Sequence, residues 1–296
     1  MATKTVQDSS LTAVANAIRA KTGKSASMEF PDGFVSEIGS ISGEADINKL
    51  IAGTLNGDLI YTATSVGRCF SNTTGVFTLS FPNATSFRVN YAIESSDVVA
   101  VSAPLITTLP SYCFSNSKKL NTVDLPLVTL VGYQAFANCK ALTSINLPKA
   151  TIQDQVFTGC SNLLYAVIGT TGTYYRQFYG CTNLKVVDMS NQGKLHQLTN
   201  GSSSFDTLIL RDTALTTLFF VAAFDNTPFA SGGTGGTIYI PKVLYDELGT
   251  GSSLDYKAAT NWSTIDGYGT ITWAQIEGSQ YENYYADGTP IEGGAT

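Results

Sequence analysis

Short apolar runs recur along this chain at a nearly constant distance. Residues 143–147 alternate polar and apolar side chains, with the period of two that is typical of a β-strand. The surrounding sequence is repeated, since Phe114 and Pro126 are followed 22 residues later by Phe136 and Pro148. Proline lacks the backbone N–H that a strand needs, so Pro148 is predicted to end its strand. Self-similarity at a short fixed period indicates a solenoid.

The repeat extends in both directions. Upstream, the 22-residue step places Ala92 and Phe70 at the phenylalanine position, and Pro104 and Pro82 at the proline position. Downstream, phenylalanine and a Gly-Cys pair return at steps of 21 residues, at Phe157 with Gly159-Cys160 and at Phe178 with Gly180-Cys181. The pattern weakens over residues 205–210 and closes at residues 238–241. It predicts about eight turns, each too small to bury its own apolar face. We expect irregular turns at Ala92 and within residues 191–231.

The repeating text resembles a known family. The pattern Ala-Phe-x-Asn/Gly-Cys-x-x-Leu-x-x-Ile/Val-x-Leu-Pro occurs at residues 135–148 and less perfectly at residues 156–167. It resembles the BspA-type leucine-rich repeats of bacteria and their phages, over roughly residues 60–241. The resemblance implies an α/β solenoid, a stack of about eight turns of 21–22 residues with a parallel sheet. The expected domains are an N-terminal module (1–42), the repeat domain (43–241) and a C-terminal cap (242–296).

Residues 1–42 predict a small helical module. Residues 8–23 read as a helix that Asp8, Ser9 or Ser10 caps and Gly23 ends, and a second short helix is expected after Pro31. The string is similar to the N-terminal module of tail and other structural proteins of phages and prophages. It can cap the open end of the solenoid, dock onto another virion protein, or do both. The first residues lack the apolar core of a signal peptide, which favours export inside an assembled particle.

The C-terminal cap is expected to contain a short helix at residues 243–248 and a closing segment at residues 256–263. Asp287-Gly288 predicts a hairpin turn within an aromatic-rich stretch. This hairpin would cover the last turn or contact another subunit. The sequence has no heptad pattern, so a homo-oligomer is neither required nor excluded.

Composition removes several function classes. Charged residues make up 14% of the chain, against about 25% in a typical domain, and the formal net charge is -6 without a basic run. We therefore expect no nucleic-acid partner. No apolar stretch approaches the roughly 20 residues that span a bilayer, so we expect no membrane insertion.

The candidate chemical groups all have plainer interpretations. His196 has no partner at metal-ligand spacing and is expected in a loop. The glycine-rich residues 232–236 are not followed by Lys-Ser/Thr and predict a loop and not a phosphate site. Asn-x-Ser/Thr occurs at Asn72, Asn83, Asn200 and Asn261. We interpret these four matches as chance. We predict no catalytic, cofactor-binding or metal-binding residue, no cofactor and no enzyme activity.

The five cysteines fall on two repeat positions. Cys139, Cys160 and Cys181 share one position, and Cys69 and Cys113 share another. They are predicted to be small buried hydrophobic residues in two ladders. Because no Cys-x-x-Cys occurs, a redox or zinc site is not expected.

A surface role is what remains. Tyr174, Tyr175 and Tyr179, with Tyr133 two turns earlier, either form an aromatic strip for glycan or protein contact or simply fill repeat positions. No binding residue is assigned from them. The function expected is a phage virion structural protein (tail, baseplate or fibre-like) that displays its repeats for host attachment and docks on virion proteins through residues 1–42. The alternatives are a purely structural capsid decoration or head fibre, and a bacterial surface adhesin.

Overall fold

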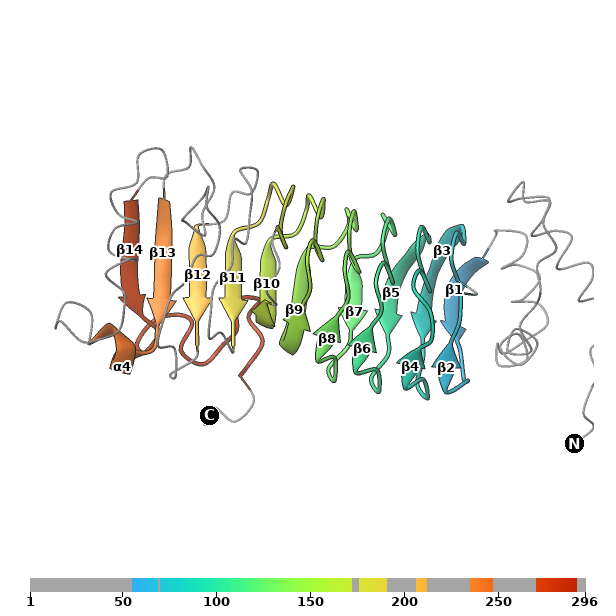
Figure 1. The fold of residues 1–296 in the computed structure, drawn as a ribbon, viewed down its shortest axis with the longest axis horizontal. Helices are drawn as coiled ribbons and strands as arrows, with labels where there is room; N and C mark the ends of the chain where they lie inside the picture. Colours follow the sequence, from blue (N-terminus) through green and yellow to red (C-terminus); the bar gives the residue numbers. More distant parts are fainter. Residues whose placement is uncertain are drawn as a thin grey trace, which may run out of the picture.

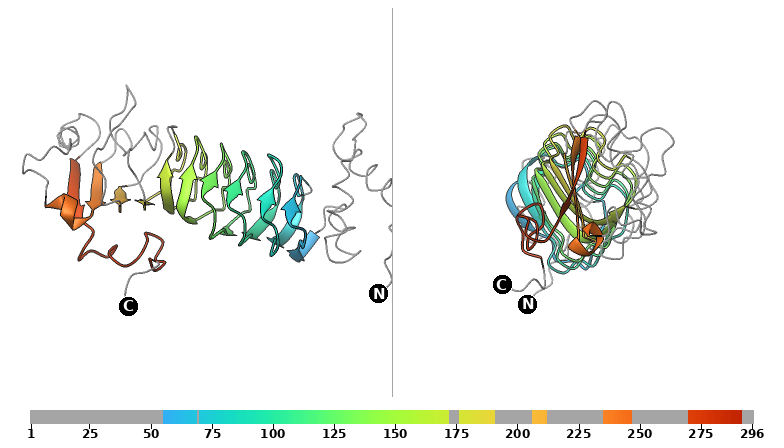
Figure 2. Two further views of the ribbon diagram at one scale, coloured as in Figure 1. Left: turned by 60° about the horizontal axis from the view of Figure 1, so that its bottom comes forward. Right: turned by 90° about the vertical axis from the view of Figure 1, so that its left-hand side faces the viewer.

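A computed structural model describes residues 55–68, 70–171, 176–190, 206–211, 235–246 and 270–291. These residues form a coil of short strands stacked along one long axis (Figure 1). Viewed from its end, successive turns superimpose around a common interior (Figure 2). The N-terminal module (1–42) and the closing segment (256–263) lie outside the described residues, so their predicted structures stay predictions.

Three parallel sheets run along the coil. The first contains β1 (Leu55–Ile60), β3 (Gly75–Ser80), β5 (Val98–Ser102) and β7 (Thr122–Asp124). The second has the order β14 (Thr270–Gln275), β13 (Gly235–Ile240), β12 (Thr207–Leu210), β11 (Val186–Met189), β10 (Tyr165–Thr171), β9 (Ser144–Ile152), β8 (Leu130–Val131) and β6 (Thr108–Leu109). The third pairs β2 (Ser65–Val66) with β4 (Ser86–Phe87). The described residues contain one short helix, α4 (Lys242–Tyr245).

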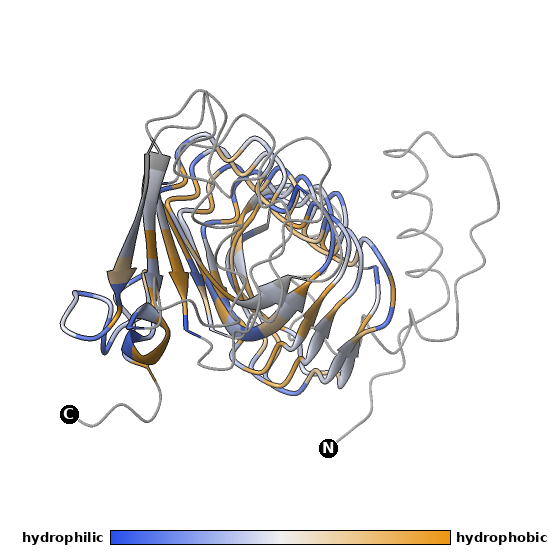
Figure 3. Cartoon of the chain, turned by 60° about the vertical axis from the view of Figure 1, so that its left-hand side comes forward, coloured by the Kyte–Doolittle hydropathy of each residue, from blue (hydrophilic) through white to orange (hydrophobic). Residues whose placement is uncertain are grey.

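The fold is therefore a parallel-sheet β-solenoid with almost no helix in its described part. One backbone pattern, presented below, recurs six times between Asn72 and Gly180. The regular stack thus has about six turns, and the eight turns expected from the sequence are not confirmed. Hydrophobic residues recur at equivalent places of the coil, turn after turn (Figure 3).

Strand β9 departs from the prediction that proline ends a strand. It continues through Pro148 to Ile152, so this one strand takes the place of the two separate strands, β7 and β8, of the preceding turn. The register against β10 shifts after Ile168, which makes room for Pro148 in a bulge without a ladder partner. A Cβ on Gly169 would lie 2.8 Å from the Ala150 oxygen, so glycine permits this close approach. Proline follows the strand end as predicted after β3, β5, β7 and β13.

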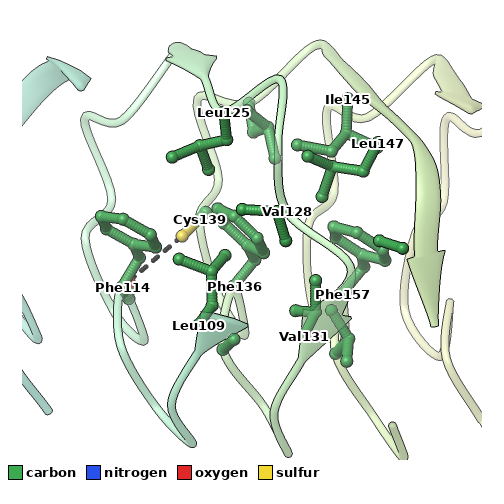
Figure 4. Packing of buried hydrophobic residues seen from close by; sticks show 14 of the residues in the cluster. Leu109, Phe114, Leu125, Val128, Val131, Phe136, Cys139, Ile145, Leu147 and Phe157 are labelled. Carbon is green, nitrogen blue, oxygen red and sulfur yellow. Dashed lines mark hydrogen bonds between the residues drawn. The ribbon is translucent and has the colours of Figure 1, made fainter. Parts of the chain in front are cut away.

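The phenylalanine ladder in the interior is confirmed. The rings of Phe114, Phe136, Phe157 and Phe178 stack with centroid distances of 5.1, 5.5 and 5.4 Å. Leucine, valine and isoleucine side chains from the strands and from the segments between them surround the rings (Figure 4). Aromatic stacking adds to the burial of the rings, so each turn stabilises its neighbours.

Ala92 does not occupy the phenylalanine position, which corrects the 22-residue alignment. Ile93 does, because its N–H donates to the Cys113 oxygen as the Phe114 N–H donates to the Ala135 oxygen. Phe81 and Phe87 are two further buried rings of the same core. A path of T-shaped ring contacts, with centroids 5.6–6.1 Å apart, leads from Phe70 through both to Phe114.

A C-terminal segment, residues 276–291, crosses the outer face of the second sheet; we call it the strap (Figure 1, red end of the chain). Its residues Ile276, Tyr281 and Ala286 belong to one apolar cluster with the outward-facing Ile209, which is fully buried. Val167, at the matching position of β10, is fully buried as well. At the matching positions of the N-terminal turns stand the polar residues Ser80, Ser102 and Asp124. Under the strap this row therefore contains apolar side chains beside Asp188, whereas these three N-terminal turns have polar residues there.

One ion pair anchors the strap. Arg211 donates from Nε to Asp188 Oδ1 at 2.9 Å and from Nη2 to Oδ2 at 2.8 Å. It also donates to the strap carbonyls of Tyr281 at 2.9 Å and Tyr284 at 2.7 Å. Burial raises the pKa of the Asp188 carboxyl, while the Arg211 guanidinium opposes that shift. The Arg211 guanidinium therefore binds main-chain oxygens of a segment about 70 residues away in the chain.

The predicted Asp287-Gly288 turn is present. Gly288 has φ +82°, and the Tyr285 N–H donates to the Thr289 oxygen at 2.9 Å. The flanking residues form a single antiparallel bridge between Tyr284 and Pro290 and not a two-stranded hairpin. The described part of the cap lies along the sheet, so an aromatic cap over the last turn is not confirmed.

Candidate functional site

Each regular turn contains a residue with a left-handed backbone that follows the phenylalanine position. Its occupants are Asn72, Ser95, Asn116, Asn138, Gly159 and Gly180. Asparagine and glycine enter this region at the lowest cost, which explains the Asn/Gly of the repeated Asn/Gly-Cys pair. The side chains also interact, since Asn138 Nδ2 donates to Asn116 Oδ1 at 3.1 Å.

A second left-handed position, four residues earlier, is occupied by long side chains. Its members are Tyr91, Tyr112, Gln134, Gln155 and Arg176, with φ of 65°, 59°, 52°, 55° and 63°. Arg68 stands at the equivalent place in the preceding turn. We call Arg68, Tyr91, Tyr112, Gln134, Gln155 and Arg176 the outer ladder. A left-handed backbone costs a non-glycine residue about 1–2 kcal/mol. The backbone conformation therefore does not explain why Tyr, Gln and Arg occupy this position.

The aromatic half of the outer ladder is tightly ordered. The Tyr91 and Tyr112 rings stack at 4.7 Å with an interplanar angle of 10°. The Arg68 guanidinium lies over Tyr91, 5.0 Å from the ring centroid. Tyr133, from the next turn, meets Tyr112 in a T-shaped contact at 5.3 Å. Arg68 also forms a 3.4 Å ion pair with Glu94, which is too exposed to add much stability.

The amide half continues this order by hydrogen bonds. Gln134 Nε2 donates to the Tyr133 hydroxyl at 3.1 Å and to Gln155 Oε1 at 2.8 Å. Gln153 Oε1 accepts from the Tyr133 N–H at 3.0 Å. Burial and the neighbouring Tyr133 and Tyr91 phenols raise the pKa of Tyr112, so its hydroxyl stays protonated in neutral solution.

The outer ladder forms one row of side chains along the solenoid. One residue comes from each turn, so the row runs parallel to the solenoid axis with steps of about 4.8 Å. The tyrosine and glutamine side chains are half-buried, and the two arginines at the ends are exposed. Among the described residues, no cluster of three His, Cys, Asp or Glu could hold a metal ion. Side chains that neighbours already fix lose little entropy when a partner docks.

The structure describes Tyr133 and Tyr179, two of the four tyrosines that could either form an aromatic strip or simply fill repeat positions. Tyr133 packs on Tyr112 as described, while Tyr179 is 44% exposed at a different repeat position. Tyr174 and Tyr175 lie outside the described residues. Sequence reasoning missed Tyr91 and Tyr112. The fixed step of 22 residues put Ala92 at the phenylalanine position, which hid that Tyr91 and Tyr112 share one repeat position. The signal that would have found them is a long side chain two residues before each buried Phe or Ile93.

The ladder of Cys139, Cys160 and Cys181 is confirmed, and its thiols have a further role. Of the second predicted ladder, only Cys113 lies among the described residues. The Sγ atoms of Cys139, Cys160 and Cys181 donate to the carbonyls of Phe114, Phe136 and Phe157 at 3.2, 3.0 and 3.1 Å. Ser117, at the same position one turn earlier, donates its hydroxyl to the Ile93 oxygen at 2.8 Å. Burial raises the pKa of Cys160 to about 12. These thiols, like that of Cys113, are free and buried.

The remaining candidates add no chemistry in the described part of the chain. Asn72 and Asn83 lie on exposed turns. His196, Cys69, Asn200, Asn261 and residues 232–234 lie outside the described residues. No helix among those described has the length and apolarity to cross a bilayer.

Comparison with known proteins identifies the repeats. The family described as BspA type leucine rich repeat region matches with six copies over residues 62–164 and 107–226, which together exceed half of the chain. No curated protein matches the sequence. The family match begins at residue 62, so the phage-like resemblance of the N-terminal module has no support from it. The chain belongs to the BspA-type leucine-rich repeat family.

Proposed function

We propose that this protein attaches to a partner on a host cell through the outer ladder, as a structural component of a phage virion. The observation that carries the attachment role is the presence of Tyr, Gln or Arg at five successive left-handed positions. Glycine or asparagine would cost less there, as the neighbouring left-handed row illustrates. Backbone strain of this kind, repeated with long side chains in mutual contact, favours a functional surface.

The virion setting rests on sequence resemblance alone. Residues 8–34 are similar to the N-terminal module of phage tail and other structural proteins. In this proposal, residues 1–42 dock on another virion protein, the chain assembles in the bacterial cytoplasm, and the repeats are displayed on the particle. Membership of the repeat family supports a binding or surface-adhesion role without favouring a phage over a cell surface.

A pair of alanine variants tests the attachment role. Tyr91→Ala with Tyr112→Ala removes the aromatic half of the ladder, and Tyr165→Ala removes a tyrosine that is 36% exposed on β10. We expect the double variant to bind host cells at least tenfold more weakly, because central tyrosines often contribute 2 kcal/mol or more to an interface. The Tyr165 variant should bind as the wild type does. Equal binding by all three folded proteins would remove the outer ladder from the proposal.

Antibody-gold electron microscopy of particles from the strain that carries the gene tests the setting. Label at the tail tip would support host attachment. Label over the capsid would favour a decoration or head fibre without its own receptor. Unlabelled particles beside labelled cells would replace the virion with a bacterial surface adhesin.

A further inference from the structure

We infer that the partner of the outer ladder is a protein surface, which meets the edges and hydroxyls of the tyrosines and not their ring faces. This inference rests on the proposed attachment function and specifies its partner. It separates two chemistries that tyrosine-rich surfaces serve, namely stacking under sugar rings and hydrogen bonding to proteins.

The broad faces of the tyrosine rings are already occupied. Arg68 comes from the turn before Tyr91 and Tyr112 from the turn after it, so they cover opposite faces of that ring. Tyr112 has Tyr91 on one side and the T-shaped contact with Tyr133 on the other. A sugar ring binds an aromatic side chain by laying its C–H groups on an open face. The two stacked rings of the outer ladder offer no such face.

The groups left to a partner are polar donors on a fixed frame. Both glutamines are held by hydrogen bonds, and Arg68 and Arg176 stand exposed at the two ends of the row. Tyrosine edges and hydroxyls with amides beside them are typical of protein-binding surfaces, because rigid rings give contact area at low entropic cost. Arg176 at one end selects a carboxylate or a main-chain oxygen, while Arg68 at the other end is already paired with Glu94.

The length of the outer ladder also suits a protein. Six positions with steps of about 4.8 Å give a row of about 24 Å. This is close to the width of a standard interface, which buries about 800 Å² on each partner. The partner therefore presents acceptor oxygens in the middle of the contact and a carboxylate near Arg176.

The sharpest probe removes hydroxyls without removing rings. Tyr91→Phe with Tyr112→Phe keeps both rings and also removes the hydrogen bond between the Tyr112 and Tyr133 side chains. Tyr165→Phe serves as the matched control on the sheet face. We would measure binding of the full-length chain to untreated cells, to protease-treated cells and to cells whose glycans were oxidised with periodate. We expect at least a tenfold loss for the double Phe variant, no change for Tyr165→Phe, loss of wild-type binding after protease treatment, and retention after periodate treatment.

The outcomes separate this inference from the attachment function. Full binding by the double Phe variant, with loss in the double Ala variant, would show that ring faces make the contact and would overturn the protein partner. Binding that survives protease but not periodate would overturn it as well, while the attachment role would stand. If the double Ala variant binds as the wild type does, or if the wild type binds no cells, the attachment function fails and the inference fails with it.

Discussion

Gly159→Ala and Gly180→Ala form a matched pair that tests how the turns are locked together. Both glycines have φ +75° at the same repeat position. A Cβ on Gly180 would lie 3.4 Å from the nearest atoms of Gly159, which is close to ordinary contact. A Cβ on Gly159 would lie 2.3 Å from Asn138 Oδ1 and would force that amide to move. The two substitutions share their backbone cost and differ in one neighbour.

The expected magnitudes follow from those two terms. Alanine in the left-handed region costs about 1–2 kcal/mol, so Gly180→Ala should lower the free energy of unfolding by that amount. Gly159→Ala adds the displacement of Asn138, which breaks its 3.1 Å bond to Asn116, worth about 1 kcal/mol. We therefore expect Gly159→Ala to cost about 2–3 kcal/mol, roughly 1 kcal/mol more than its control.

Denaturant unfolding of the full-length variants, followed by circular dichroism, measures these differences. Asn138→Gly supplies the decisive background, because it removes the amide that the new Cβ would strike. In that background, both alanine substitutions should cost the same, and the coupling between residues 138 and 159 should be about 1 kcal/mol. Equal costs in the original background, or a difference that persists with Asn138→Gly, would refute the locking role of this amide.

Three further predictions concern the strap, the thiols and the aromatic core. Arg211→Ala leaves buried Asp188 unpaired and should destabilise the docked strap by about 3–5 kcal/mol. The rate of limited proteolysis within residues 276–291 measures this loss. Lys242→Ala, which breaks an exposed ion pair, should change that rate little. Because burial raises the pKa of Cys160 to about 12, the thiol keeps its proton in the folded state. Its contribution to the free energy of unfolding is therefore complete below pH 9.0 and is lost as the pH rises toward about 12. Cys160→Ser, which does not titrate there, should reduce the loss of stability by about 1.4 kcal/mol per pH unit, and equal slopes for both proteins would contradict the assignment. Phe136→Ala, which removes a ring stacked on both sides, should cost about 3–5 kcal/mol in denaturant unfolding, and a cost below about 1 kcal/mol would argue against the ladder.

The interior of the repeats could be predicted because it obeys a translation along the chain. A buried Phe136 contacts the equivalent residues one turn before and one turn after, so the same demand for an apolar side chain returns every 21 or 22 residues. The Asn/Gly-Cys pair recurs along the sequence for the same reason. Each copy needs a left-handed residue and then a short donor for the carbonyl of the previous turn. Contacts that repeat from turn to turn therefore produce a sequence pattern with the same period.

The tertiary structure decided what is not periodic. A single slipped residue moved Ile93 into the core and Tyr91 into the outer ladder, and no fixed step along the sequence reveals it. The course of β9 past Pro148 depends on the bulge opposite Gly169. The strap is the clearest case, because Arg211 and Asp188 bind segments 70 to 98 residues away that occur once in the chain. Contacts between unique segments depend on how the completed coil places its outer face, and only the folded chain brings them together.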